Sequence, residues 1–310
     1  MKKIVYPGFY SEKKIGSLYL PDTLQAVSEG QKAGLSSSSE DKRRVRLLLV
    51  DTQVDFIHQD GSLSVPGALA DTKRTIEFIF ANIDEITSIA ASLDTHTLFQ
   101  IFYPTWWINE RGEHPAPFTM ITLADVKKGS WRPLLDPVGS IKYLAELEEK
   151  AKKVLMIWPF HTMVGTPGHA VVPSLFEGIV YHGAARNSQP TWLIKGMIPQ
   201  TEHYSILEPE VKIAKHPMGA LNTSFLDDLA RYDIIYVAGQ AKSHCVLETM
   251  RSITRYFKDQ SEVVAKIRFL MDCTSSVQHP DIDFDAMANQ ELKEMEKLGV
   301  QLVKSTDSIK

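Results

Sequence analysis

The sequence predicts an α/β fold with an open, mostly parallel β-sheet and helices on both faces of that sheet. Two observations predict it. Short apolar runs alternate along the chain with longer amphipathic stretches, which is the order of elements that builds a parallel sheet. Some of these runs are apolar without interruption, such as Leu47-Leu48-Leu49-Val50, as expected for strands buried on both faces.

The strands are expected at the short apolar runs. The first covers residues 45–50, directly after a polar stretch. The others are predicted at residues 86–93, 154–158, 211–214, 234–238, 267–271 and 300–303.

The helices are expected where apolar residues recur at helical spacing. In residues 68–84, for example, Ile76, Ile79, Phe80 and Ile83 fall on one helix face. Further helices are predicted at residues 141–152, 221–231, 246–257 and 284–298.

The chain is expected to form one α/β domain, residues 45–310, preceded by an N-terminal arm and linker, residues 1–44. Tyr6-Pro7-Gly8 interrupts regular structure, and four serines followed by charged residues, 36–44, resemble a linker. Two stretches, residues 97–139 and 173–209, are longer than ordinary connections, so we expect insertions there.

Composition excludes several classes of protein. Of the 310 residues, 44% are hydrophobic, which excludes a disordered chain. The 34 basic and 38 acidic residues give a net charge of −4, which favours neither nucleic acid nor an anionic membrane surface as a partner.

No run approaches the ~18 apolar residues of a membrane span. The two cysteines cannot form a disulfide framework, so a cytoplasmic protein is expected. A homo-oligomer is compatible with the sequence.

Chemically useful side chains follow five of the predicted strands. Because ligands bind beyond the carboxyl ends of the strands in such sheets, these side chains are expected to form one site. They are Asp51, Asp94 with His96, His161, Lys215, and His244 with Cys245.

Three of these residues suggest nucleophilic chemistry. Asp51 is either a helix N-cap or a partly desolvated carboxylate suited to proton transfer. Cys245 is either an inert buried cysteine or, at the start of a helix, a stabilised thiolate. Lys215 is either a solvated lysine or a cation that bridges Cys245 and Asp51. Cys273 has no activating neighbour and is interpreted as structural.

Asp94, His96 and His161 suggest a metal site. In an extended chain the side chains of Asp94 and His96 point the same way, so both can reach one ion. With His161 they supply a carboxylate and two imidazoles, a set that suits Zn, Fe or Mn. His114 is either a fourth ligand or an exposed loop histidine.

The order of these motifs resembles a known family, the nicotinamidase branch of the isochorismatase-like cysteine hydrolases. The resemblance runs from about residue 45 to the C-terminus. The motifs that carry it are Asp51-x-Gln53-x-Asp55-Phe56, Asp94-x-His96, Trp158-Pro159-x-His161, Gly165-Thr166-Pro167-Gly168, Lys215 and His244-Cys245-Val246.

The resemblance implies an isochorismatase-like, Rossmann-like three-layer fold and assigns roles to individual residues. Asp51, Lys215 and Cys245 would form the catalytic triad. Asp94, His96 and His161 would hold a divalent transition metal, with zinc expected and iron or manganese as alternatives. A cis peptide near Gln240-Ala241 would turn the Ala241 N–H toward an oxyanion, and Phe56 and Trp158 would wall the substrate pocket.

The second predicted insertion carries a rival for the lysine of the triad, Lys195, which is followed by Gly196. Lys215 is preferred because it ends a predicted strand. It also precedes Asn222-Thr223-Ser224-Phe225, which is similar to a small-polar and Phe element of the family.

The activity that the resemblance implies is hydrolysis of a small planar amide, with nicotinamide going to nicotinate and ammonia through a thioester on Cys245. One alternative is another hydrolase of the superfamily that acts on a carbamoyl or ureido amide. Such enzymes usually lack the metal set. Vinyl-ether hydrolysis of the isochorismate type is less favoured because it needs no cysteine. A further alternative is a non-catalytic binding protein on the same fold.

Overall fold

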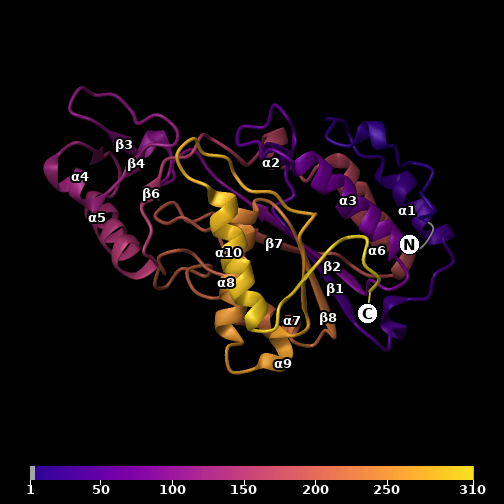
Figure 1. The fold of residues 1–310 in the computed structure, drawn as a ribbon. Coiled ribbons are helices and arrows are strands. Elements are labelled where there is room, and N and C mark those ends of the chain that lie inside the picture. The colour runs from indigo at the N-terminus through magenta and orange to yellow at the C-terminus, as the bar shows by residue number, and fades with distance from the viewer. Residues whose placement is uncertain (1–3, 310) are drawn as a thin grey trace.

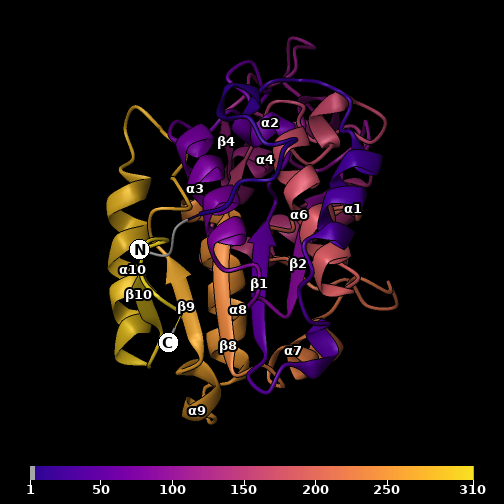
Figure 2. The same ribbon diagram turned by 90° about the vertical axis from the view of Figure 1, so that its right-hand side faces the viewer.

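A six-stranded parallel sheet forms the centre of the computed structural model, which describes residues 4–309 (Figure 1). The strands lie in the order β10-β9-β8-β1-β2-β7, and Figure 2 shows β9, β8, β1 and β2 side by side. Their bounds are β1 Val45–Val50, β2 Ser88–Asp94, β7 Thr191–Lys195, β8 Ile234–Gly239, β9 Ile267–Leu270 and β10 Gln301–Val303. The predicted fold class is confirmed.

Strand β1 is central and fully buried: it lies between β2 and β8, with Leu47 paired to Ile89 and to Tyr236, and helices cover both faces of the sheet. Since successive side chains point to opposite faces, β1 contributes to two cores. Leu48 and Val50 belong to one hydrophobic cluster, and Val45, Leu47 and Leu49 belong to another. This explains why five of the six residues of β1 are apolar.

Helices cover both faces of the sheet (Figure 1). Helices α3 (Ala68–Ala81) and α6 (Pro173–Arg186) contribute to the core that contains Leu47. Helices α7 (Thr223–Leu229), α8 (Leu247–Tyr256) and α10 (Phe284–Lys297) contribute to the core that contains Leu48. The short helices α2 (Val54–Ile57) and α9 (Ser261–Val264) lie in the connections. Within residues 4–309, no helix has both the length and the apolar character needed to cross a bilayer.

The prediction that residues 1–44 form an arm and linker is wrong for the part of this segment that the structure describes. Residues 1–3, and residue 310 of the predicted domain, lie outside the described residues. Helix α1 (Thr23–Lys32) packs against α6, and the side chain of Glu177 in α6 accepts hydrogen bonds from the Tyr19 hydroxyl and the Asp22 N–H. The buried residues of α1, Ala26 and Gly30, are small, so no helical stripe of large apolar residues marks this helix in the sequence.

The prediction of an insertion at residues 173–209 is also wrong. This stretch contains α6 and the edge strand β7 of the central sheet. Helix α6 was missed because it is buried on several sides and therefore lacks an amphipathic pattern. Conversely, the strand predicted at residues 211–214 is a loop. The first predicted insertion, residues 97–139, does leave the central sheet.

Residues 97–165 form a lobe that lies to one side of the sheet (Figure 1). It contains helices α4 (Leu123–Lys128) and α5 (Pro137–Glu146) and two antiparallel strand pairs. The pairs are β3 (Trp107–Ile108) with β5 (Arg132–Pro133), and β4 (Met120–Ile121) with β6 (Leu155–Met156). The strand predicted at residues 154–158 is therefore part of the lobe. The lobe has its own aromatic-rich core, which includes Tyr103, Trp106, Trp107 and Tyr143.

Candidate active site

Four adjacent strands bring polar side chains to one edge of the sheet. Asp94 is the last residue of β2 and Lys195 the last residue of β7, and the two are paired in the strand register. Asp51 directly follows β1. Cys245 lies in a short π-helical turn between β8 and α8. Because neighbouring parallel strands end at the same edge, these four residues meet although they are far apart in the sequence.

Lys195 connects the carboxylate of Asp51 to the thiol of Cys245. Its Nζ lies 3.0 Å from Asp51 Oδ2 and donates to Cys245 Sγ at 3.6 Å. The second oxygen of Asp51 accepts a hydrogen bond of 2.5 Å from the hydroxyl of Ser92 in β2. All of these side chains are buried. These three side chains have the arrangement expected of an Asp–Lys–Cys triad, with Lys195 at the position of the lysine.

The prediction of Lys215 as the triad lysine is wrong in position. Its side chain is exposed, and it lies in a loop with the positive φ of 68°. The run Val211-Lys212-Ile213-Ala214 does not pair with the sheet. A usable signal was present at Lys195, which ends an apolar run, Trp192-Leu193-Ile194, and is followed by a glycine.

Gly196 is required because the backbone turns beside the metal-ligand candidates. Its φ is +81°, and a Cβ there would lie 2.6 Å from Cε1 of His96 and 2.7 Å from Oδ1 of Asp94. A larger residue would displace both side chains. The absence of a side chain at Gly196 therefore leaves the space beside Lys195 that His96 and Asp94 occupy.

Burial and neighbouring charges shift the pKa of Asp51, Lys195 and Cys245. Burial raises the pKa of the Cys245 thiol well above its ordinary value; Lys195 opposes this, whereas Asp51 and Asp94 add to it. Burial also raises the pKa of Asp51, against the effect of Lys195. Burial alone would lower the pKa of Lys195, but Asp51 and Asp94 hold it well above its ordinary value. The raised pKa of the thiol does not favour the thiolate that the helix N-terminus suggests in the sequence.

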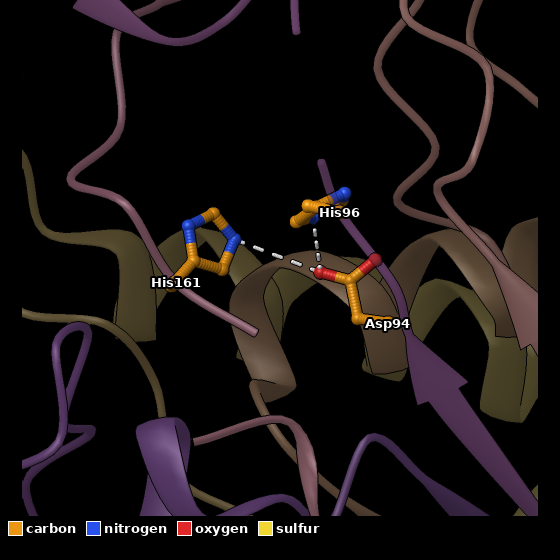
Figure 3. Close-up of side chains that lie close together, drawn as sticks. All are labelled: Asp94, His96 and His161. Carbon is orange, nitrogen blue, oxygen red and sulfur yellow. Dashed lines mark hydrogen bonds and ion pairs between the residues drawn. The ribbon is translucent and has the colours of Figure 1, made fainter. Parts of the chain in front are cut away.

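Asp94, His96 and His161 converge on one point (Figure 3). Oδ2 of Asp94 lies 2.8 Å from Nε2 of His96 and 3.6 Å from Nε2 of His161. The candidate ligand atoms of the three residues all lie within 4.8 Å of one another. The other oxygen of Asp94 accepts a hydrogen bond of 2.7 Å from Lys195, which joins this set to the triad.

The hydrogen bonds of the two rings fit a bound cation. A carbonyl oxygen can only accept, so Nδ1 of His96 donates to Gly196 O at 3.1 Å and Nδ1 of His161 donates to Pro159 O at 2.8 Å. Burial lowers the pKa of His96, which keeps its ring neutral. Its Nε2 therefore presents a lone pair to the carboxylate of Asp94, an arrangement that a divalent ion between them stabilises.

His114 does not belong to this set. Its side chain is exposed in the lobe, and its Nδ1 donates to Trp107 O at 2.7 Å. Within residues 4–309, Asp94, His96 and His161 are the sole group of three or more side chains that could hold a metal ion.

A small pocket lies between Cys245 and the metal-ligand candidates. Its walls include Phe56 and Trp158, as the sequence predicts, together with Tyr204 and His244. Trp158 and His244 contact edge to face at 5.3 Å between ring centroids. The enclosed volume is about 30 Å³, room for roughly two waters. A ring-shaped ligand therefore needs these side chains to move.

The backbone shortly before Cys245 has the cis peptide that the resemblance implies, at Gln240-Ala241. Ala241 lines the same pocket as Cys245. The location of Ala241 is therefore compatible with the predicted role of its N–H as a donor to an oxyanion.

Glu202 is a pocket residue that the sequence did not reveal. Its side chain is 6% exposed and lines the pocket with Cys245 and Asp94. Oε1 accepts a hydrogen bond from the His203 N–H at 3.1 Å, whereas Oε2 has no partner in the described part of the chain. Burial, aided by Asp94, raises the pKa of Glu202 to about 7. A ligand that donates a hydrogen bond could pair with Oε2.

Comparison with known proteins confirms the predicted fold resemblance. No family model and no curated protein matches the chain. Its fold matches the yeast nicotinamidase bound to the inhibitor nicotinaldehyde, with a TM-score of 0.56 and 18% identity over 84% of this chain and 99% of that chain. It also matches a nicotinamidase/pyrazinamidase of Acinetobacter baumanii, with a TM-score of 0.54 and 19% identity over 86% and 99% of the two chains. The chain therefore has the isochorismatase-like α/β fold of these enzymes.

Proposed function

We propose that the chain is a cysteine amidohydrolase that acts on a small planar amide, with nicotinamide as the first candidate. One observation carries the proposal. A single buried lysine, Lys195, contacts the candidate base Asp51, the candidate nucleophile Cys245 and the metal-ligand candidate Asp94. Solved nicotinamidases of the same fold support the choice of substrate.

The proposed reaction begins with proton transfer from the thiol of Cys245 to Asp51. The sulfur then attacks the amide carbonyl carbon, and the charge of Lys195 stabilises the thiolate as it forms. The backbone N–H groups of Ala241 and Cys245 are the candidate donors to the oxyanion; losing one such donor typically costs ~2.7–4 kcal/mol.

The second half of the reaction regenerates the thiol. Asp51 gives its proton to the departing nitrogen, so that ammonia leaves and a thioester remains on Cys245. Water then hydrolyses the thioester to the free carboxylic acid, and the thiol recovers its proton.

A divalent ion held by Asp94, His96 and His161 would supply an open coordination position for a lone pair, such as that of a pyridine nitrogen. Zinc is the first choice, with iron or manganese as alternatives. Phe56 and Trp158 suit the two faces or edges of a flat ring, and thus align the amide over Cys245.

A panel of three amides tests the proposed substrate by release of ammonia. Nicotinamide should be the fastest. Benzamide should be clearly slower, because it keeps the ring and the amide but lacks the ring nitrogen. Equal rates for the two would argue against alignment through the ring nitrogen, and a preference for an N-carbamoyl amino acid would favour the alternative hydrolase. Binding of nicotinamide without hydrolysis would favour the non-catalytic alternative.

A further inference from the structure

One buried hydroxyl of the lobe, that of Tyr103, bonds to the main chain of the metal-ligand candidate His161, which lies in the same lobe. Tyr103 Oη donates to the carbonyl oxygen of His161 at 2.6 Å and accepts from the N–H of the same residue at 3.2 Å. Both main-chain polar groups of His161 are thus bonded to one side chain. Neither the triad nor the pocket walls use this residue.

His161 needs such support because it is not part of a helix or a strand. It lies in the loop that follows β6, and the next residue, Thr162, has a φ of +47°. Asp94, by contrast, ends β2 and is fixed by the sheet. The position of His161 relative to Asp94 therefore depends on contacts made by the loop. These include a bond of 2.7 Å from the Thr162 N–H to Asp55 Oδ2.

The two residues just before Tyr103 are held by hydrogen bonds to other parts of the chain. The N–H of Ile101 donates to Pro199 O, which follows β7, and the N–H of Trp158 donates to Phe102 O, each at 2.8 Å. The Tyr103 ring contacts the rings of His96 and His161 edge to face, with both centroid distances at 5.8 Å. A fixed hydroxyl at this point limits where His161 can lie.

We propose that Tyr103 is a positioning residue for the metal site, so that the lobe sets the affinity of the site for its ion. The inference rests on the proposed function only in assuming that Asp94, His96 and His161 bind a metal. Bonds to the groups that carry the ligands orient those ligands, and their loss typically weakens metal affinity 10–100-fold.

The test is titration of the metal-free protein with Co²⁺, followed by visible absorption and without substrate. Tyr103→Phe removes only the hydroxyl, and it should weaken cobalt binding at least about 10-fold and alter the absorption spectrum. The matched control is Tyr232→Phe. The Tyr232 hydroxyl is also buried, accepts from Ser88 Oγ at 3.0 Å and lies before β8, at the opposite end of the sheet. This control should bind cobalt as the unaltered protein does.

Two further measurements separate positioning from general destabilisation. In a His161→Ala background, Tyr103→Phe should cause no additional loss of cobalt affinity, and an additional loss would contradict the inference. In the unaltered protein, the His161 amide should be protected from hydrogen exchange although it lies outside regular structure. Rapid exchange there would overturn the inference even if Tyr103→Phe does not fold.

The outcomes distinguish this inference from the proposed function. Unchanged cobalt affinity in Tyr103→Phe overturns the inference alone. If the unaltered protein binds no cobalt, the metal site itself is wrong, and the inference is overturned with it.

Discussion

Lys195 contacts both the candidate catalytic residues, Asp51 and Cys245, and the metal-ligand candidate Asp94. Its Nζ contacts the carboxylates of Asp51 and Asp94, at 3.0 and 2.7 Å, and the thiol of Cys245. Two buried carboxylates so close together are stable as anions only with a cation between them. The lysine thus has both a structural and a proposed catalytic role.

Lys195→Met should lower amide hydrolysis by on the order of 10²–10³-fold, the usual cost of removing a preorganised charge or donor. It should also destabilise the fold by about 3–5 kcal/mol, because it leaves buried carboxylates unpaired. Lys215→Met is the control. Since Lys215 is exposed in a loop, this variant should keep the activity and the urea midpoint of the unaltered protein. Loss of activity in Lys215→Met but not in Lys195→Met would instead support Lys215 as the lysine of the triad.

The two cysteines should differ in reactivity, and the difference should depend on pH. Cys245 lines the pocket, whereas Cys273 is 1% exposed and burial raises its pKa to about 12. Iodoacetamide should therefore label Cys245 first. Because the pKa of Cys245 is also raised in the resting site, its labelling rate should climb as pH rises through 7 to 9. A rate independent of pH from 6 to 9 would show a preformed thiolate.

Among the individual site residues, the sequence predicted those that follow a clear apolar run or belong to a motif with a recognisable spacing. Asp51 follows four consecutive apolar residues, 47–50, and Asp94-x-His96 and His161 carry recognisable spacings. Lys195 was not preferred because β7 is an edge strand whose residues are mostly half-buried, so its pattern is weak. Glu202 and Tyr103 belong to irregular segments, where no periodicity marks an inward-facing side chain.

At the scale of elements, the contact of α1 with α6 shows how a helix can be decisive for packing yet hard to detect. The two helices approach closely because Gly30 of α1 has no side chain. A Cβ on Gly30 would lie 2.6 Å from Tyr181 O and 2.8 Å from Ala184 Cβ in α6. Both neighbours are rigid parts of a helix, so neither can move freely.

Gly30→Ala tests this packing through the sign of its effect. In an isolated helix the change would stabilise by about 1 kcal/mol. In the packed helix pair the clash should dominate and destabilise by about 1–3 kcal/mol. The measurement is the urea midpoint, with exposed Gln31→Ala as the control in the same helix. If Gly30→Ala makes the protein more stable, the close packing of α1 against α6 is contradicted and the predicted arm and linker is favoured.

At the scale of the whole molecule, the metal-ligand candidates join the central sheet to the lobe. Asp94 and His96 come from the end of β2, and His161 comes from the loop after β6. An ion bound by all three would therefore link two parts of the fold that otherwise meet through side-chain packing and a few hydrogen bonds.

Metal binding should accordingly stabilise the folded protein. At an ion concentration 100 times the Kd, the gain is about 2.7 kcal/mol, and the melting temperature should rise as zinc is added to metal-free protein. About one equivalent should bind. His161→Ala should abolish the rise, whereas His114→Ala should leave it unchanged, because the His114 side chain bonds to Trp107 O in the lobe. A zinc-dependent rise that survives in His161→Ala would place the ion elsewhere.

The central sheet was predictable because most residues of β1, β8 and β9 are apolar and buried, although β1 and β9 each contain one arginine. The outer layer was less predictable. Helix α6 has buried residues on several sides and α1 buries only small ones, so neither shows the stripe that identifies a surface helix. Edge strand β7 was assigned to an insertion because its residues are mostly half-buried, and Lys195 was therefore named only as the rival of Lys215.

Ammonia release from nicotinamide by the zinc-loaded protein, beside the same assay of Cys245→Ala, tests the central claim most directly. Steady release by the unaltered protein and none by the variant is the predicted result, because Cys245 is the sole proposed nucleophile in the pocket. No release by the zinc-loaded protein, or equal release by Cys245→Ala, would contradict the proposed function.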